Sequence, residues 1–140
     1  MKILVINGPN LNLLGEREPG IYGTGTMDDV MQMLRENFPD IDFEYYQSNI
    51  EGELIDRLQS ARIDGTDGIV FNAGAYTHTS VALHDCIRSI DKPVVEVHIS
   101  NVAKREEFRH TSLIASACVG TIAGFGLNSY RLAVEALILG

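Results

Sequence analysis

Five short runs of strand-forming residues, separated by segments with helical periodicity, constrain the fold of this chain more than any other feature. The first run is continuous and apolar, the second contains aromatic residues, and together they cover Lys2–Asn7, Phe43–Ser48, Gly68–Asn72, Pro93–Ser100 and Gly120–Gly126. Apolar, β-branched and aromatic residues in short runs favour strands. We therefore predict five strands.

Helical periodicity is clearest between the first two runs. Apolar residues recur there three and four positions apart, at Met27, Val30, Met31, Leu34 and Phe38. Thr26 is the predicted N-cap, with Asp29 three residues further on. Similar patterns predict helices over 54–62, 83–90 and 130–138. Strands that alternate with helices favour a parallel sheet with helices on both faces, so we predict a five-stranded, flavodoxin-like α/β fold.

Length and composition indicate one domain over residues 1–140, because 45% of the residues are hydrophobic, 21% are charged and no linker interrupts them. No apolar run approaches the roughly 20 residues of a membrane span, and the first strand lacks the features of a signal peptide. Cys86 and Cys118 are expected to be buried free thiols. We therefore expect a cytoplasmic protein without membrane contact.

The net charge of −8 argues against a nucleic-acid partner, because no basic stripe offsets phosphate repulsion. It does not exclude a small anionic substrate. At physiological salt the field of distant charges is screened beyond about 8 Å, so a local cluster of arginines would decide whether an anion binds.

Polar side chains gather where three of the predicted strands end, in the segments NGPNLN, NAGAYTHTS and EVHISN. Ligands of parallel sheets bind at this edge. Glu96 and His98 lie two residues apart on one strand and therefore face the same side. Such a pair can transfer protons, the carboxylate fixing the imidazole tautomer, or it can be a purely structural pair.

Other kinds of site have weaker support. The segment Gly124–Ser129 resembles a dinucleotide fingerprint but follows the last strand, so close helix–strand packing explains it better. No metal is expected, because the histidines lack the spacing of a metal cluster; they are His78, His84, His98 and His110. No Schiff base is expected either, because none of the three lysines falls at the predicted site; they are Lys2, Lys92 and Lys104.

Three blocks, NGPNLNLLGEREPGIYG, NAGAYTHTSVALHD and EVHISNVAKREEFR, together resemble the type II dehydroquinase (3-dehydroquinate dehydratase) family over nearly the whole chain. The resemblance implies a lyase that dehydrates 3-dehydroquinate to 3-dehydroshikimate through an enolate, without cofactor or metal. This reaction belongs to the shikimate route to aromatic amino acids, and some relatives serve quinate breakdown instead. The family also implies a homo-oligomer, a dodecamer built from trimers.

The resemblance also implies roles in the chemistry. Tyr22, on a lid loop over about 15–25, matches the base, and Arg17 on the same loop matches the transition-state stabiliser that favours its phenolate form. His98 matches the general acid, with Glu96 orienting it, and Asn10 matches the residue that holds a water against the enolate oxygen. A guanidinium about 4 Å from a phenolate supplies up to about 4 kcal/mol at an effective dielectric of 20, so the first pairing is physically reasonable.

Further positions match substrate-binding residues. Asn72 and the backbone amides of Ile99 and Ser100 would bind the substrate carboxylate, and His78 and Arg109 would bind the ring hydroxyls. Asp85 matches a residue inserted from a neighbouring subunit, although it could equally be a solvated acid on a helix face. Arg105 is expected to hold a second loop, over about 101–110, across the site.

Two departures from the family pattern are visible, HTSL after Arg109 in place of His-Ser-Tyr, and Ser129 where glycine is common. Two other classes stay open on the sequence. A flavin- or nucleotide-binding relative of flavodoxin would be coloured or stabilised by FMN. A catalytically silent assembly protein on the same scaffold would show no turnover.

Overall fold

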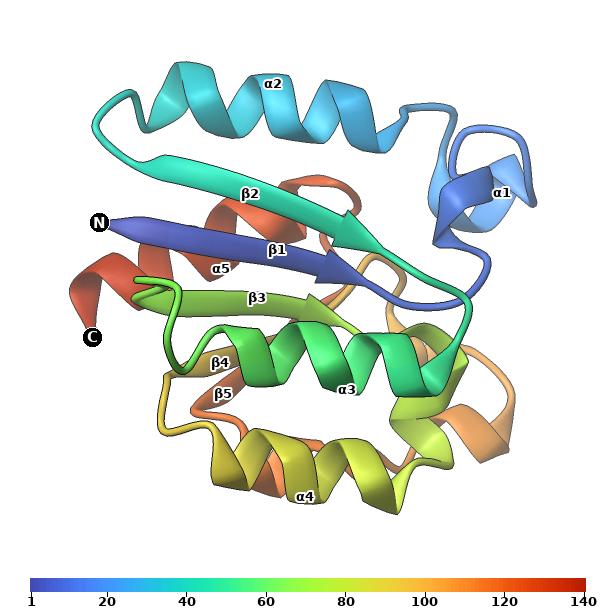
Figure 1. Cartoon of the computed structure of the whole chain (residues 1–140). Coiled ribbons are helices and arrows are strands. Elements are labelled where there is room, and N and C mark those ends of the chain that lie inside the picture. Colours follow the sequence, from blue (N-terminus) through green and yellow to red (C-terminus); the bar gives the residue numbers. More distant parts are fainter.

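A five-stranded parallel sheet in the order β2-β1-β3-β4-β5 forms the centre of the protein, as seen in a computed structural model that describes residues 1–140 (Figure 1). Its strands are β1 (Lys2–Asn7), β2 (Asp42–Gln47), β3 (Gly68–Asn72), β4 (Val94–His98) and β5 (Gly120–Ala123). Strand order reverses at β1, whose neighbours are β2 on one side and β3 on the other. The predicted five-stranded α/β fold is confirmed.

Helices cover both faces of this sheet (Figure 1). Helices α2 (Met27–Asn37) and α5 (Asn128–Leu139) pack on one face, and α3 (Glu51–Ser60) and α4 (Val81–Ser89) pack on the other. The alternation along β1 explains this arrangement, because Ile3 and Val5 belong to the first core and Leu4 and Ile6 to the second. A strand buried on both faces requires an apolar residue at nearly every position.

Element boundaries follow local signals in the sequence. The α2 helix begins directly after Thr26, whose side chain accepts a hydrogen bond from the Asp29 backbone N–H while the Asp29 carboxylate accepts one from the Thr26 backbone. The β5 strand is shorter than predicted and ends before Gly124, where φ is +95° and the chain turns. The β4 strand is also shorter and ends at His98.

The glycine-containing segment after β5 serves packing. Ser129 is fully buried, and its hydroxyl accepts a hydrogen bond from the Phe125 backbone N–H at 3.1 Å. Neither cysteine forms a disulfide; Cys86 is buried as expected, whereas Cys118 is only partly buried. Burial raises the pKa of the Cys118 thiol to about 12. None of the helices is long and apolar enough to cross a membrane.

Candidate active site

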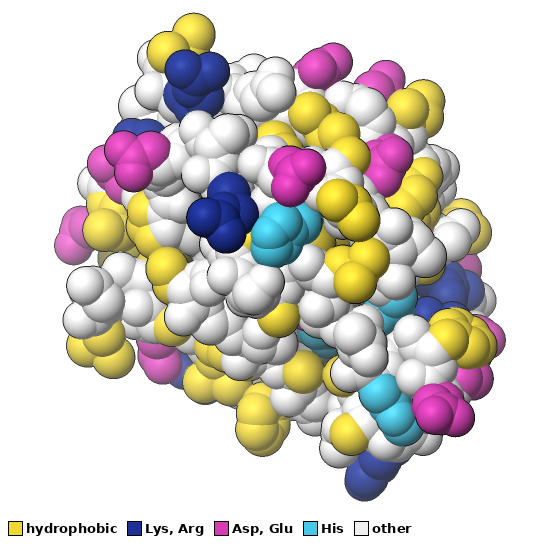
Figure 2. All heavy atoms as spheres, turned by 90° about the horizontal axis from the view of Figure 1, so that it is seen from below, with side chains coloured by type: hydrophobic (Ala, Val, Ile, Leu, Met, Phe, Trp, Pro, Cys, Tyr) yellow, Lys and Arg dark blue, Asp and Glu magenta, His cyan; other side chains and the backbone are white.

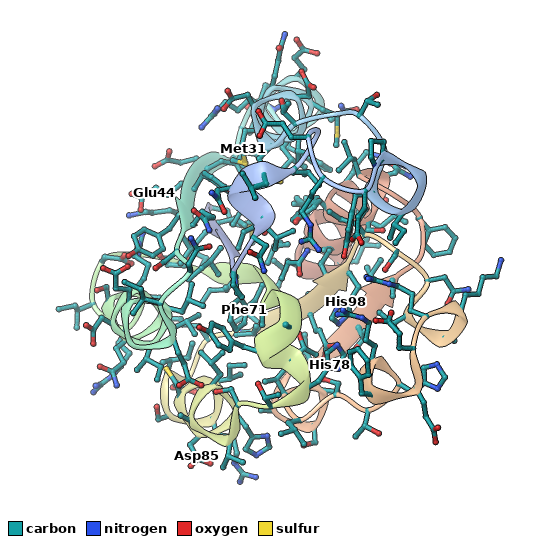
Figure 3. The ribbon with its side chains drawn as sticks, turned by 90° about the vertical axis from the view of Figure 1, so that its right-hand side faces the viewer. Met31, Glu44, Phe71, His78, Asp85 and His98 are labelled. Carbon is teal, nitrogen blue, oxygen red and sulfur yellow. The ribbon has the colours of Figure 1, made fainter.

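A pocket lies at the carboxyl ends of β1, β3 and β4, beside the point where strand order reverses (Figure 3). Asn10 follows β1, Asn72 ends β3 and His98 ends β4, so three neighbouring strands deliver one polar side chain each. Every predicted site residue lines this pocket except Glu96 and Asp85. The arrangement agrees with the general position of ligand sites in open parallel sheets.

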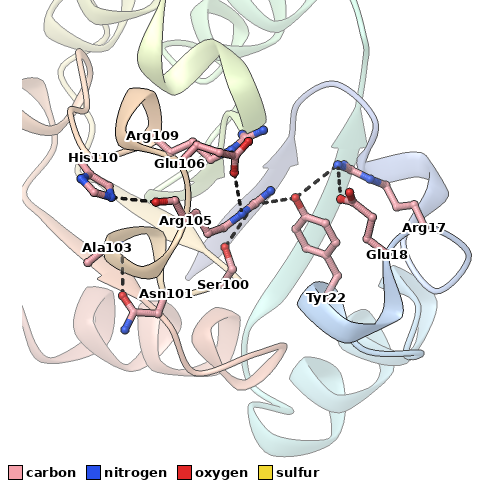
Figure 4. Close-up of polar contacts among 10 residues, drawn as sticks. All are labelled: Arg17, Glu18, Tyr22, Ser100, Asn101, Ala103, Arg105, Glu106, Arg109 and His110. Atoms are coloured by element: carbon pink, nitrogen blue, oxygen red, sulfur yellow. Dashed lines mark hydrogen bonds and ion pairs between the residues drawn. The ribbon is translucent and has the colours of Figure 1, made fainter.

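The Tyr22 phenol oxygen lies between two guanidinium groups (Figure 4). Arg105 Nη1 donates to it at 2.8 Å, and Arg17 Nη2 donates at 3.3 Å. Arg17 also pairs with the Glu18 carboxylate at 3.3 Å, which withdraws part of its charge from the phenol. Arg105, expected only to hold the second loop, therefore makes the shorter contact with Tyr22. Sequence reasoning missed this role because 83 residues separate the two positions.

The first loop contains a short helix, α1 (Pro19–Tyr22), where no local structure was expected. Pro19 occupies its first turn, where a fixed φ and the missing N–H cost nothing. Gly15 and Gly23 lie at positive φ, +95° and +79°, on either side of it. Directly before the helix Glu18 also has a left-handed backbone, with φ at +39°, and Gly23 turns the chain directly after the helix that presents Tyr22 to the pocket.

Glu96 and His98 form a buried pair at the end of β4. The two side chains share a face of the strand, and His98 Nε2 is hydrogen-bonded to Glu96 Oε2. Glu96 is only 1% exposed, and its other oxygen accepts hydrogen bonds from Ser112 at 3.0 Å and Thr121 at 3.4 Å. His98 Nδ1 has no partner in the protein and is free to face a ligand.

Groups that can donate hydrogen bonds to an anion surround the same pocket. The backbone N–H groups of Ile99 and Ser100 donate to no acceptor in the protein. The His78 ring stacks on that of His98 at a centroid distance of 6.2 Å, and His78 Nδ1 donates to the Thr111 carbonyl at 2.8 Å. These contacts fix the His78 ring and leave its Nε2 for a ligand.

Asn10 and Arg109 complete the set of side chains. Asn10 has a left-handed backbone, with φ at +69°, and its N–H donates to the Asn49 side chain at 3.0 Å. Arg109 comes from the second loop, where its Nε donates to Glu106 at 3.1 Å. Hydrogen bonds from its own backbone and from Arg109 hold the pKa of Glu106 below its usual value.

The charge of the pocket is opposite to that of the whole chain. Arg17, Arg105 and Arg109 line it, whereas no aspartate, glutamate or lysine does. A chain with a net charge of −8 thus holds a local cationic site, as a small anionic ligand requires. No three His, Cys, Asp or Glu side chains converge in a way that would hold a metal ion.

Asp85 lies away from this pocket, on the exposed side of α4 (Figure 3). The pocket of its own chain therefore does not contain it. Figure 2 shows the molecule from the α4 side, with apolar side chains scattered among single charged ones. Val81, at the start of α4, is 63% exposed.

Comparison with known proteins gives one consistent result. The family model described as dehydroquinase class II matches residues 1–138. A 3-dehydroquinate dehydratase from Rhizobium etli is 60% identical over 139 residues, which cover 96% of this chain and 94% of the relative. One from Caldicellulosiruptor bescii is 52% identical over 138 residues, 97% of this chain and 95% of the relative.

The fold comparison agrees. A crystal structure of type II dehydroquinase from Butyrivibrio crossotus superposes with a TM-score of 0.96 at 51% identity, covering 99% of this chain and 97% of that one. A whole-chain family match and relatives above 50% identity leave no ambiguity about ancestry. The resemblance noted in the sequence is confirmed, and the chain belongs to the class II dehydroquinase family.

Proposed function

We propose that this protein catalyses the trans-dehydration of 3-dehydroquinate to 3-dehydroshikimate through an enolate, with neither a Schiff base nor a metal. Family membership supports the reaction, since the relatives are named 3-dehydroquinate dehydratases. The observation that carries the mechanism is the Tyr22 oxygen held between Arg17 and Arg105 in a pocket that three arginines line.

The first step is removal of a proton from C2 of the substrate, next to the ketone. Tyr22 acts as the base in its phenolate form, which the two guanidinium groups stabilise. One cation about 4 Å from the oxygen supplies up to about 4 kcal/mol at an effective dielectric of 20. The electron pair moves to the ketone oxygen, where Asn10 holds a water against the developing enolate.

The second step is loss of the C1 hydroxyl. His98 donates a proton to the leaving oxygen, which departs as water while the enolate collapses to the conjugated enone. Glu96 fixes the ring and stabilises its charged form, as the buried hydrogen bond between them supports. Tyr22 ends with one proton more and His98 with one fewer, and exchange with solvent restores both.

Binding of the ring uses the remaining groups. The substrate carboxylate accepts hydrogen bonds from Asn72 and from the free N–H groups of Ile99 and Ser100. His78 and Arg109 bind the ring hydroxyls. The absence of lysine from the pocket lining supports a route without a covalent imine.

The proposal extends to assembly and location. The active form is a homo-oligomer built from trimers, a dodecamer, in the cytoplasm. Asp85 reaches the substrate from a neighbouring subunit, and its exposed position outside its own pocket supports this role. The surface around α4 then becomes part of an interface rather than a solvated face.

The direct test is to add 3-dehydroquinate to the purified protein and follow the ultraviolet absorbance of the conjugated enone. Absorbance rises at a rate proportional to protein, and neither a chelator nor borohydride changes that rate. A coloured protein that binds FMN without turnover favours the flavodoxin-type alternative. Oligomers that show neither turnover nor FMN binding indicate an assembly protein.

A further inference from the structure

A buried chain of hydrogen bonds lies beneath the pocket, and Asn72 is the only one of its members with a part in the steps above. Asn72 Nδ2 donates to the Tyr130 hydroxyl at 3.0 Å, and that hydroxyl donates to Asn7 Oδ1 at 2.9 Å. Asn7 Nδ2 then donates to the Tyr45 hydroxyl at 3.2 Å. Asn7, Asn72 and Tyr130 are buried, with Tyr130 at 0% exposure, so water does not replace these partners.

The direction of every bond in this chain is set at one end. The Gly74 backbone N–H, which can only donate, is 3.1 Å from Asn72 Oδ1. The oxygen of this amide is therefore committed to Gly74, and its nitrogen must face Tyr130. Because the Tyr130 oxygen accepts from Asn72, its own proton goes to Asn7. No alternative arrangement satisfies all of these buried groups.

One hydrogen of the Asn72 amide is then left over. Nδ2 carries two, of which Tyr130 receives one, and the second has no acceptor in the protein. Asn72 lines the pocket although it is only 4% exposed. The geometry therefore aims a single, fixed N–H at a ligand.

We propose that Tyr130 is a positioning residue for substrate binding, whose hydroxyl holds the Asn72 amide so that one N–H faces the pocket. The inference rests on the proposed role of Asn72 in binding the substrate carboxylate. Tyr130 lies 58 residues from Asn72 and reaches it from α5. Burial raises the pKa of Tyr130 above its ordinary value, so the hydroxyl keeps the proton that it gives to Asn7.

The variant Tyr130→Phe removes the hydroxyl and keeps the packed ring. Asn72 Nδ2 then loses its acceptor and Asn7 Oδ1 its donor. Because Asn7 and Asn72 are register partners in neighbouring strands, we expect Asn72 to donate to Asn7 instead, which redirects the N–H that faces the pocket. We expect KM for 3-dehydroquinate to rise about tenfold with kcat within threefold, because a contact shared by bound substrate and transition state affects binding alone. Adding Asn72→Ala to Tyr130→Phe raises KM no further than Asn72→Ala alone.

Two controls separate positioning from stability. Thr66→Val removes another fully buried hydroxyl, bonded to Asp64 at 2.6 Å, at the opposite end of β3. It lowers the melting temperature and leaves KM unchanged. Tyr45→Phe makes the same chemical change at the far end of the chain, and it also leaves KM unchanged because the bond from Asn72 to the Tyr130 hydroxyl remains.

A lower melting temperature in Tyr130→Phe with KM unchanged overturns the inference. Additive effects of Tyr130→Phe and Asn72→Ala on KM overturn it as well. Should Tyr130→Phe fail to fold, Asn7→Ala tests the same chain by removing the acceptor of the Tyr130 proton, and an unchanged KM there also overturns it. Nuclear magnetic resonance of the Asn72 side-chain amide gives a readout without substrate, since its signals shift in Tyr130→Phe. If the wild-type protein shows no turnover, the result contradicts the proposed function, but the resonance signals of the Asn72 amide still test the inference about Tyr130.

Discussion

Tyr22 is the residue on which the proposed chemistry depends most. Replacing it with phenylalanine removes the only oxygen that both Arg17 and Arg105 contact, while the ring remains. We expect Tyr22→Phe to lower kcat by at least about 10³-fold, because proton abstraction loses its base, with KM changed little. Steady-state rates from enone absorbance measure this, and a kcat within tenfold of wild type would remove tyrosine as the base.

His98 offers a second test, since the two proposed proton transfers use different residues. His98→Ala should abolish release of water yet retain exchange of the C2 proton with solvent. Proton exchange in deuterated buffer, followed by nuclear magnetic resonance, reports the first step alone. Loss of exchange together with elimination would assign His98 to substrate positioning instead.

Sequence and structure differ at the residue scale in an instructive way. The positions of the pocket residues at strand ends were predictable, because ligands bind at the carboxyl edge of an open parallel sheet. The hydrogen bond from Arg105 to Tyr22 and the one from Asn72 to Tyr130 were not predictable. Each depends on a contact between distant segments, and Tyr130 lies within an apolar helical pattern that already explains it as core.

At the scale of elements, a hydrogen bond from Arg105 to Tyr22 joins the second loop to the first (Figure 4). Arg105→Met should therefore lower kcat at least as much as Arg17→Met, by about 10²-fold, because Arg105 makes the shorter contact and Glu18 shares Arg17. The neighbouring Lys104→Met is the matched control, since Lys104 does not line the active pocket. A smaller effect for Arg105 than for Arg17 contradicts this assignment.

The capping box of α2 gives a prediction about stability alone. Thr26→Ala removes the side-chain acceptor of the Asp29 N–H and should lower the free energy of unfolding by about 1 kcal/mol. Thr24→Ala, at an exposed position two residues earlier, should change it by less than about 0.5 kcal/mol. Denaturant titration measures both, and equal effects would mean that the cap contributes nothing.

Elements were predicted best where a local signal fixed their ends. The β1 and β3 strands have the bounds that their apolar runs indicate, and α2 starts at the residue after its cap. The α1 helix was missed, since Pro-Gly in a polar segment favours a turn, whereas the backbone of Glu18–Gly23 closes one helical turn there. The length of the β5 strand was overestimated, because the sequence does not reveal that the chain already turns at Gly124, before the predicted end at Gly126.

For the whole molecule, the position of Asp85 leads to a prediction about assembly. Because Asp85 lies outside its own pocket, Asp85→Ala should raise KM only in an oligomeric protein. Asp56→Ala, an exposed acid on α3, is the matched control and should leave KM unchanged. Size-exclusion chromatography coupled to light scattering gives the subunit count, and a fully active monomer would contradict the proposed role of Asp85.

The contact of the Tyr22 phenol with arginines from two loops has a consequence for which ketones the site can deprotonate. The two cations come from different loops, so a movement of the second loop away from the first would remove the Arg105 contact and leave Tyr22 with Arg17 alone. We therefore expect proton abstraction only from a ligand that leaves both loops in place, and unrelated ketones that enter an open site should not be deprotonated. If the two loops part and rejoin in each catalytic cycle, turnover should slow in viscous solvents.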